Sequence, residues 1–126
     1  MNKKQVIEFH SYCVMEGPGS GDWVVLINEK KGELSKNFTI QNINISENKI
    51  EKFWSNIDNL GVWKWNKKYP CRKSKLISMP DGHEWWLKLR DKKDKAKYCT
   101  GYESYPKNFK KFIKELNSLF GSNIKY

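Results

Sequence analysis

The sequence predicts an α+β fold, in which an antiparallel sheet is built from two strand–hairpin–helix units. The predicted order is β-β-β-α-β-β-β-α, with both helices packed on one face of the sheet. Strand-forming residues open each half of the chain, an amphipathic pattern closes each half, and the two halves align loosely. In that alignment residues 23–27 match residues 85–89, and the apolar positions of 50–60 match those of 109–119.

In the first half, residues 6–14 are rich in strand formers, and the glycine-rich stretch 16–22 is typical of a flexible turn. Residues 23–27 are apolar on both faces, as a central strand would be. Residues 29–32 are predicted to turn the chain, and 38–40 are predicted to form a third strand.

A helix is expected next, because apolar residues recur at helical spacing after a capping residue. Ser46 is the predicted N-cap, and Gly61 is the predicted end of the helix. The apolar positions between them are Ile50, Phe53, Trp54, Ile57 and Leu60.

The second half repeats this plan. Residues 75–78 are predicted to be a short strand, 80–82 a turn, 91–94 a charged turn and 96–100 a returning strand. Residues 84–90 alternate strictly, so that Trp85, Leu87 and Leu89 point one way and Trp86, Lys88 and Arg90 the other.

The predicted final helix has Pro106 in its first turn and ends at Gly121. Its apolar stripe consists of Phe109, Phe112, Ile113, Leu116 and Leu119. A single domain over residues 1–126 is expected, with a first unit at 1–61 and a basic second unit at 62–126.

Two short motifs lie in the last third of the chain. The first is Asp81-Gly82-His83-Glu84-Trp85, and the second begins at Gly101 and continues through Tyr105-Pro106. Together they resemble a DGxxW…GxNxYP pattern of small uncharacterised bacterial and phage proteins, from which the chain departs at Glu103, where that pattern usually has Asn. The resemblance implies a β-hairpin followed by a helix, and it implies no activity.

The net positive charge is confined to the second half. Residues 1–62 carry 7 Lys/Arg and 8 Asp/Glu, whereas residues 63–126 carry 17 Lys/Arg and 6 Asp/Glu, for a net charge of +10 over the chain. A genome-wide bias towards lysine would load both halves alike. We therefore expect the second half to gather its cations on one coherent patch that meets an anionic partner.

The strongest candidate for that patch is the run from residue 63 to residue 75, which contains no acid. Its cations can neutralise phosphates, and its rings can stack on bases. The alternative is a solvated basic loop whose tryptophans are buried. The candidate binding residues in this run are Trp63, Lys64, Trp65, Lys67, Lys68, Tyr69, Arg72, Lys73 and Lys75.

A second candidate surface is the outward face of the alternating segment. It carries Trp86, Lys88 and Arg90, with Lys92 and Lys93 beyond. An exposed Trp flanked by cations is typical of binding surfaces. The alternative is that the N-terminal segment or a second copy of the chain covers this face.

Catalytic, metal and cofactor sites are not predicted. Asp81, His83 and Glu84 crowd one turn, but turn formation already accounts for the Asp-Gly pair. The Gly-rich stretch 17–21 lacks the Lys-Ser/Thr ending of a P-loop. Cys13, Cys71 and Cys99 lack zinc-ligand spacing and are expected to be free thiols in a reducing cytosol.

Three functions remain open at this stage. The first is a non-enzymatic cytoplasmic binding protein whose second half engages nucleic acid or a nucleoprotein. The second is a phage or mobile-element inhibitor, or an immunity-type protein, that blocks an acidic protein such as a nuclease or defence effector. The third is a small metal-dependent nuclease or nucleotide hydrolase, for which the turn acids would have to converge with Glu8, His10 or Asp22. No membrane span or signal peptide is expected, and the sequence leaves the oligomeric state open.

Overall fold

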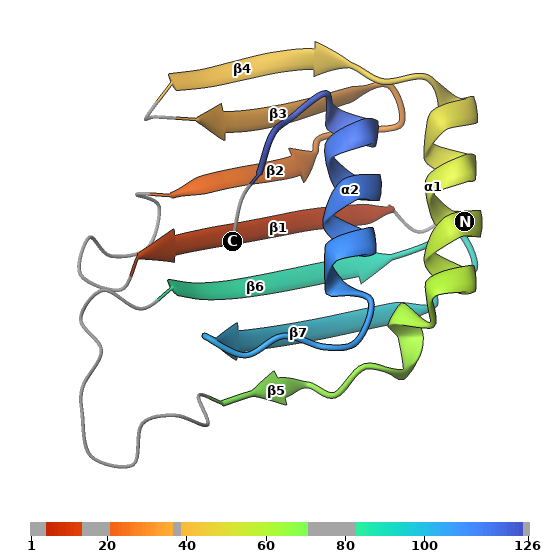
Figure 1. Cartoon of the computed structure of the whole chain (residues 1–126). Helices are drawn as coiled ribbons and strands as arrows, with labels where there is room; N and C mark the ends of the chain where they lie inside the picture. Colours follow the sequence, from red (N-terminus) through yellow and green to blue (C-terminus); the bar gives the residue numbers. More distant parts are fainter. Residues whose placement is uncertain (1–4, 14–20, 37–38, 71–82, 125–126) are drawn as a thin grey trace.

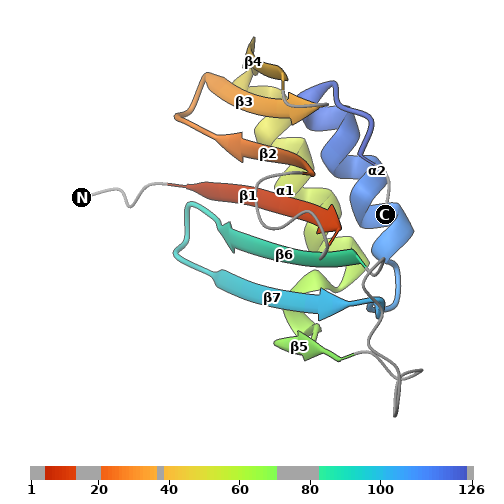
Figure 2. The same ribbon diagram turned by 90° about the vertical axis from the view of Figure 1, so that its left-hand side faces the viewer.

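A computed structural model describes residues 5–13, 21–36, 39–70 and 83–124, and it confirms the α+β fold. Two helices lie on one face of a seven-stranded sheet (Figures 1 and 2). The elements are β1 (Val6–Cys13), β2 (Asp22–Leu26), β3 (Lys31–Lys36), β4 (Thr39–Asn44), α1 (Glu47–Leu60), a 3₁₀ turn (Val62–Lys64), β5 (Lys68–Tyr69), β6 (His83–Arg90), β7 (Ala96–Tyr102) and α2 (Phe109–Phe120).

The strand order is β4-β3-β2-β1-β6-β7-β5, so the sheet joins the two predicted units at its centre. There β1 and β6 pair antiparallel along their whole length, from Val6 opposite Arg90 to Cys13 opposite His83. Every pair is antiparallel except that of β5 with β7. The junction is therefore an extensive strand pairing between the two units.

The structure differs from the prediction between β2 and β4. The turn lies at residues 28–30, where the Asn28 side chain accepts hydrogen bonds from the backbone N–H groups of Lys30 (2.8 Å) and Lys31 (2.9 Å). Gly32, predicted to lie in the turn, belongs to β3. A Cβ built there would lie 2.7 Å from Ile45 and 2.8 Å from Phe120, so this glycine serves packing. The predicted strand at 75–78 and the turn at 80–82 lie outside the described residues.

The predicted helix ends are confirmed for α1. The Ser46 hydroxyl accepts a hydrogen bond from the N–H of Lys49 (3.3 Å), and Gly61 takes the left-handed conformation that ends the helix (φ 74°). Gly121 ends α2 in the same way (φ 65°). The position of Pro106 was wrong: it precedes α2, and its carbonyl accepts from Phe109 N–H in the turn before the helix.

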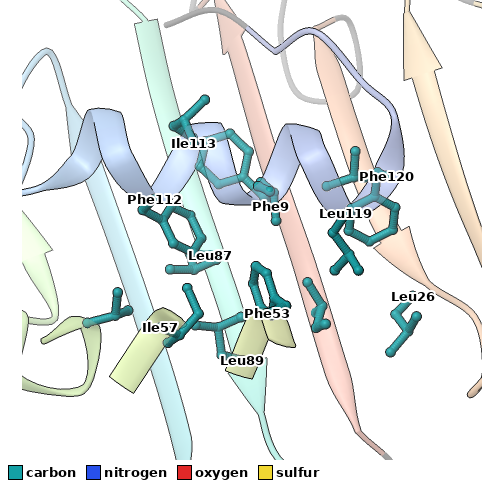
Figure 3. Close-up of a cluster of buried hydrophobic side chains, with 14 of the residues drawn as sticks. Phe9, Leu26, Phe53, Ile57, Leu87, Leu89, Phe112, Ile113, Leu119 and Phe120 are labelled. Atoms are coloured by element: carbon teal, nitrogen blue, oxygen red, sulfur yellow. The ribbon is translucent and has the colours of Figure 1, made fainter. Parts of the chain in front are cut away.

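Both helices bury their apolar stripes against the same face of the sheet, and one core results (Figure 3). Phe9 of the central strand meets Phe109 and Phe112 of α2, with ring centroids 6.1 and 6.4 Å apart. Phe53 of α1 meets Phe112 in turn (6.4 Å). The two units therefore share one core.

Residues of the two motifs of the last third pack together. The indole N–H of Trp85 donates to the Ser104 carbonyl (3.0 Å), and the Trp85 ring stacks on Tyr105 (centroids 6.3 Å apart). A Cβ at Gly101 would lie 2.3 Å from Trp85 Nε1. The Trp85 and Gly101 positions of the pattern thus have a structural explanation, because a glycine is needed where the indole crosses β7. Among the described residues, no helix is long and apolar enough to cross a membrane.

Candidate functional site

The face of the sheet opposite the helices carries polar and aromatic side chains. Successive strand residues point to opposite faces, so in β1 Ile7 and Phe9 enter the core while Glu8 and His10 face the other way. No described helix covers this second face (Figure 2). We call it the open face.

Three aromatic side chains stack in a line at the centre of the open face. His10 lies between Trp86 and Trp23: its ring centroid is 4.0 Å from that of Trp86, with planes 13° apart, and 5.7 Å from that of Trp23, with planes 22° apart. The three residues are direct cross-strand neighbours on β2, β1 and β6. Because neighbouring strands lie about 4.8 Å apart, side chains that stand on the sheet stack face to face. We call Trp23, His10 and Trp86 the aromatic row.

The row belongs to a line of paired residues that crosses the entire sheet. From β4 to β5 this line contains Ile40, Ser35, Trp23, His10, Trp86, Thr100 and Lys68. Thr100 is small compared with Trp86, and Lys68 at the edge is exposed. The Trp86 ring therefore projects further from the sheet than Thr100, its neighbour on β7, and Lys68 lies one strand beyond Thr100.

A hollow of ≈ 610 Å³ lies around Lys88 and Tyr98 on the same face. Lys88 Nζ is 5.4 Å from the centroid of the Trp86 ring and 5.6 Å from that of Tyr98. Arg90 Nε is 3.5 Å from Asp94 Oδ1. The hollow is lined by Val6, Glu8, Lys88, Leu89, Arg90, Ala96, Lys97 and Tyr98. We call the aromatic row and this hollow together the open-face site.

Burial and the neighbouring carboxylates set the protonation of two groups on this face. Burial lowers the pKa of His10 from its ordinary value of 6.5, although the hydrogen bond to Glu8 (Nε2 to Oε2, 3.0 Å) acts in the opposite direction. Burial, together with the hydrogen bond that the Tyr12 hydroxyl donates to Glu84, raises the pKa of Tyr12 to about 12. His10 is therefore neutral within the row at pH 7.

The lowered pKa of His10 predicts a stability that depends on pH. Below about pH 6.5 the unfolded chain binds a proton at His10 more readily than the folded chain, so the free energy of unfolding should fall as the pH falls through that range. His10→Phe keeps a ring in the row and removes the titration. Thermal melts at several pH values should therefore show a weaker dependence between about pH 7 and 5 for the variant. An identical dependence in both proteins would contradict the prediction.

Four of the residues predicted from the sequence share the open face. Trp86, Lys88 and Arg90 follow one another on β6, and Lys68 lies two strands away. Trp86 is half-buried in the row, whereas both lysines and the arginine are exposed. The structure therefore brings together the second predicted candidate surface and one cation of the first.

Among the rings of the run 63–75, Trp65 is buried, whereas Trp63 and Tyr69 are half-buried against other rings. Trp65 is in the core (7% exposed), where its ring packs on Phe109 and Phe112. Tyr69 points to the same side and packs on Trp85 (6.1 Å). Trp65 is therefore corrected to a packing residue of the core, and Tyr69 is half-buried on the side of the sheet that carries the helices.

Trp63 is half-buried and lies away from the open face. Its ring stacks on Trp54 of α1, with centroids 6.0 Å apart, and its indole N–H donates to Asp58 (2.5 Å). Lys95 Nζ lies 5.2 Å from the centroid of the same ring. Trp63 thus closes the end of α1, on the helix side of the sheet.

Those cations of the second half that lie in the described residues do not gather on one patch. Lys92 pairs with Glu51 of α1 (3.6 Å), and the neighbouring Lys93 is exposed in the β6–β7 turn. Lys64 and Lys67 are exposed near the β5 edge. A further group is exposed at or on α2, in the helix layer: Lys107, Lys110, Lys111 and Lys114. The predicted cations Arg72, Lys73 and Lys75 lie outside the described residues. Alternation along strands and rotation around a helix separate charges that are close in sequence.

The acid–base candidates do not converge in the described part of the chain. His83 and Glu84 are successive strand residues and point to opposite faces, and Asp81 lies outside the described residues. Within the described ranges no group of three His, Cys, Asp or Glu residues could hold a metal ion. Cys99 is buried in the core, which raises the pKa of its thiol to about 11.

Sequence reasoning missed Trp23, His10 and Tyr98 as members of the site. Alternation alone places His10 on the face opposite Phe9, and it places Trp23 on the face opposite Val24. Alternation does not predict that β1 pairs with β6, and this pairing places His10 next to Trp86. That pairing spans the two halves of the chain.

No family model, curated protein or solved structure matches the chain.

Proposed function

We propose that this chain is a non-enzymatic cytoplasmic protein that binds single-stranded nucleic acid, alone or in a nucleoprotein complex, at the open-face site. The observation that carries the proposal is Trp86, which ends the aromatic row beside Lys88 and Arg90. Stacking rings with adjacent cations are the two components of single-strand recognition. A sheet face is a common place for them.

Different residues of the site are suited to bind the bases and the phosphates of a single strand. Tyr98 is 51% exposed and lines the hollow, so its ring can stack on a base. Arg90 can hold a phosphate through two parallel hydrogen bonds, and Lys88 can neutralise a second. The bases of a duplex already stack on one another, so a single strand is the form that offers base faces to these rings.

The test is the affinity for a fluorescein-labelled single strand of mixed sequence, measured by anisotropy at several salt concentrations. The double variant Lys88→Ala with Arg90→Ala should bind more weakly. The slope of log affinity against log salt should also fall by about 1.4, since each phosphate contact with a single strand contributes about 0.7. The annealed duplex of the same sequence should bind more weakly than the single strand.

A matched control removes the same charge from the helix layer. Lys110→Ala with Lys111→Ala alters two exposed lysines on the opposite side of the sheet. We expect this control to keep most of the affinity and salt slope. Equal losses in both double variants would show that binding follows net charge alone, and no binding at low salt would remove the proposal.

A protein partner is the second candidate, and one observation favours it. The open face carries Glu8, Glu33 and Glu84 among its cations, and acids at these positions repel a polyanion. A face of mixed charge with Trp, Tyr and Arg is typical of protein interfaces, as the inhibitor or immunity hypothesis requires. Capture from a host lysate with and without nuclease separates the two: a polypeptide retained after digestion favours the protein partner.

A further inference from the structure

β4 is an outer strand, and no described residue pairs with its outer edge. It pairs with β3 alone and lies at the end of the sheet (Figure 1). Antiparallel strands direct their backbone N–H and C=O groups to both sides, so an outer strand presents a row of groups that a further strand can bind. Its side chains are largely exposed, and Ile40 is 58% exposed.

The composition of β4 is unusual for an outer strand. Thr39–Asn44 contains no charged residue and no proline, although 30% of the chain is charged. Among the described strands, β4 is the one that lacks a charged residue. Proteins commonly prevent edge pairing with lysine, proline or a very short strand. The opposite edge has all three, because β5 has two residues and lies within Lys67-Lys68-Tyr69-Pro70.

We propose that β4 pairs antiparallel with the β4 strand of a second copy of this chain. A two-fold axis perpendicular to the sheet produces this arrangement, and it joins the two sheets edge to edge. A second copy presents the same uncharged edge, which is self-complementary under this two-fold axis. Each chain carries a net charge of +10, so two copies repel each other overall, but pairing through β4 does not place cation against cation.

The proposed dimer has two consequences that follow from its symmetry. Ile40 of each copy lies against the other copy's strand, so its exposed surface is reduced. Both open-face sites lie on the same side of the joined sheet, because the axis is perpendicular to it. The proposal of a dimer is argued from the edge strand β4 alone, so it does not depend on what the open-face site binds.

Sedimentation velocity of the full chain, from micromolar to millimolar concentration, tests the proposal. We expect the mass to rise from 15.0 kDa towards twice that value. Added salt should favour the dimer because it screens the repulsion between copies, whereas it weakens binding to nucleic acid. The opposite salt responses keep this proposal distinguishable from the proposed function.

The deciding variant is Ile40→Lys with Asn42→Lys, which places two charges on the exposed face of β4. It should stay at 15.0 kDa throughout. The matched control is Asn59→Lys with Ser118→Lys, which adds the same charge at exposed positions of α1 and α2 and should still dimerise. Circular dichroism should show both variants folded.

Hydrogen exchange of the unaltered chain gives a second, independent measurement. The amides of residues 39–44 should become more protected as the concentration rises, while those of β5 should not change. A wild-type chain that is monomeric at every concentration would overturn the proposal. A dimer that survives the β4 variant, or is lost equally in the control, would do the same, as would a different polypeptide bound along β4.

Discussion

Replacing Trp85 by Ala should lower the free energy of unfolding by about 3–5 kcal/mol, the usual cost of removing a large aromatic ring from a core. Trp85 is 1% exposed and packs on Phe9, Phe109 and Tyr105. Its neighbour Trp86 points to the open face. Replacing Trp86 by Ala should cost only about 1 kcal/mol, the value of its stacking on His10.

Urea titration followed by far-ultraviolet circular dichroism measures both changes. If Trp85→Ala does not fold, Trp85→Phe, which keeps a ring in the core, is the variant whose stability is measured instead. In the binding assay Trp86→Ala should lose about 1–3 kcal/mol, the range for removing one stacking ring. If Trp86→Ala proved the more destabilising change, the open face would have to be covered by another part of the protein.

Replacing Gly101 by Val should also be strongly destabilising. Even a Cβ at this position would lie 2.3 Å from Trp85 Nε1 and 2.7 Å from the Ser104 carbonyl oxygen. The second of these contacts is to the backbone, which cannot move aside as a flexible side chain can. Overpacking of this kind costs about 1–3 kcal/mol.

Thr100→Val is the control for this substitution. It places the same side chain one residue earlier in β7, on the open face beside Trp86. Thermal unfolding should show little change for Thr100→Val and a clear drop in melting temperature for Gly101→Val. Equal stability of the two variants would mean that Trp85 and the following turn can rearrange around a larger side chain.

Local sequence patterns predicted much of the fold. The helix stripes, Ser46, Gly61 and Gly121 followed from interactions within a few residues, and the alternation of 84–90 followed from the period of a strand. The turn before β3 was misplaced because Gly32 has a packing role. A glycine required by a distant side chain cannot be distinguished in the sequence from a glycine required by a turn.

The candidate site was harder to predict, because it depends on which strands are neighbours. Lys88, Arg90 and Trp86 were found since they share one strand and one face. Trp65 was misassigned because a ring near cations in the sequence can point into the core, as this one does. His10 reaches Trp86 only through the β1–β6 pairing, and no local pattern specifies a partner so distant in the chain.

The central pairing of β1 with β6 has a consequence for synthesis on the ribosome. β1 is synthesised before β6, which begins at His83, so the edge of β1 that pairs with β6 in the native sheet is unpaired while the intervening chain emerges. Contacts between segments so far apart in sequence form slowly. We therefore expect a chain interrupted before His83 to expose the strand that forms the middle of the finished sheet, and to need a chaperone or rapid degradation to avoid aggregating.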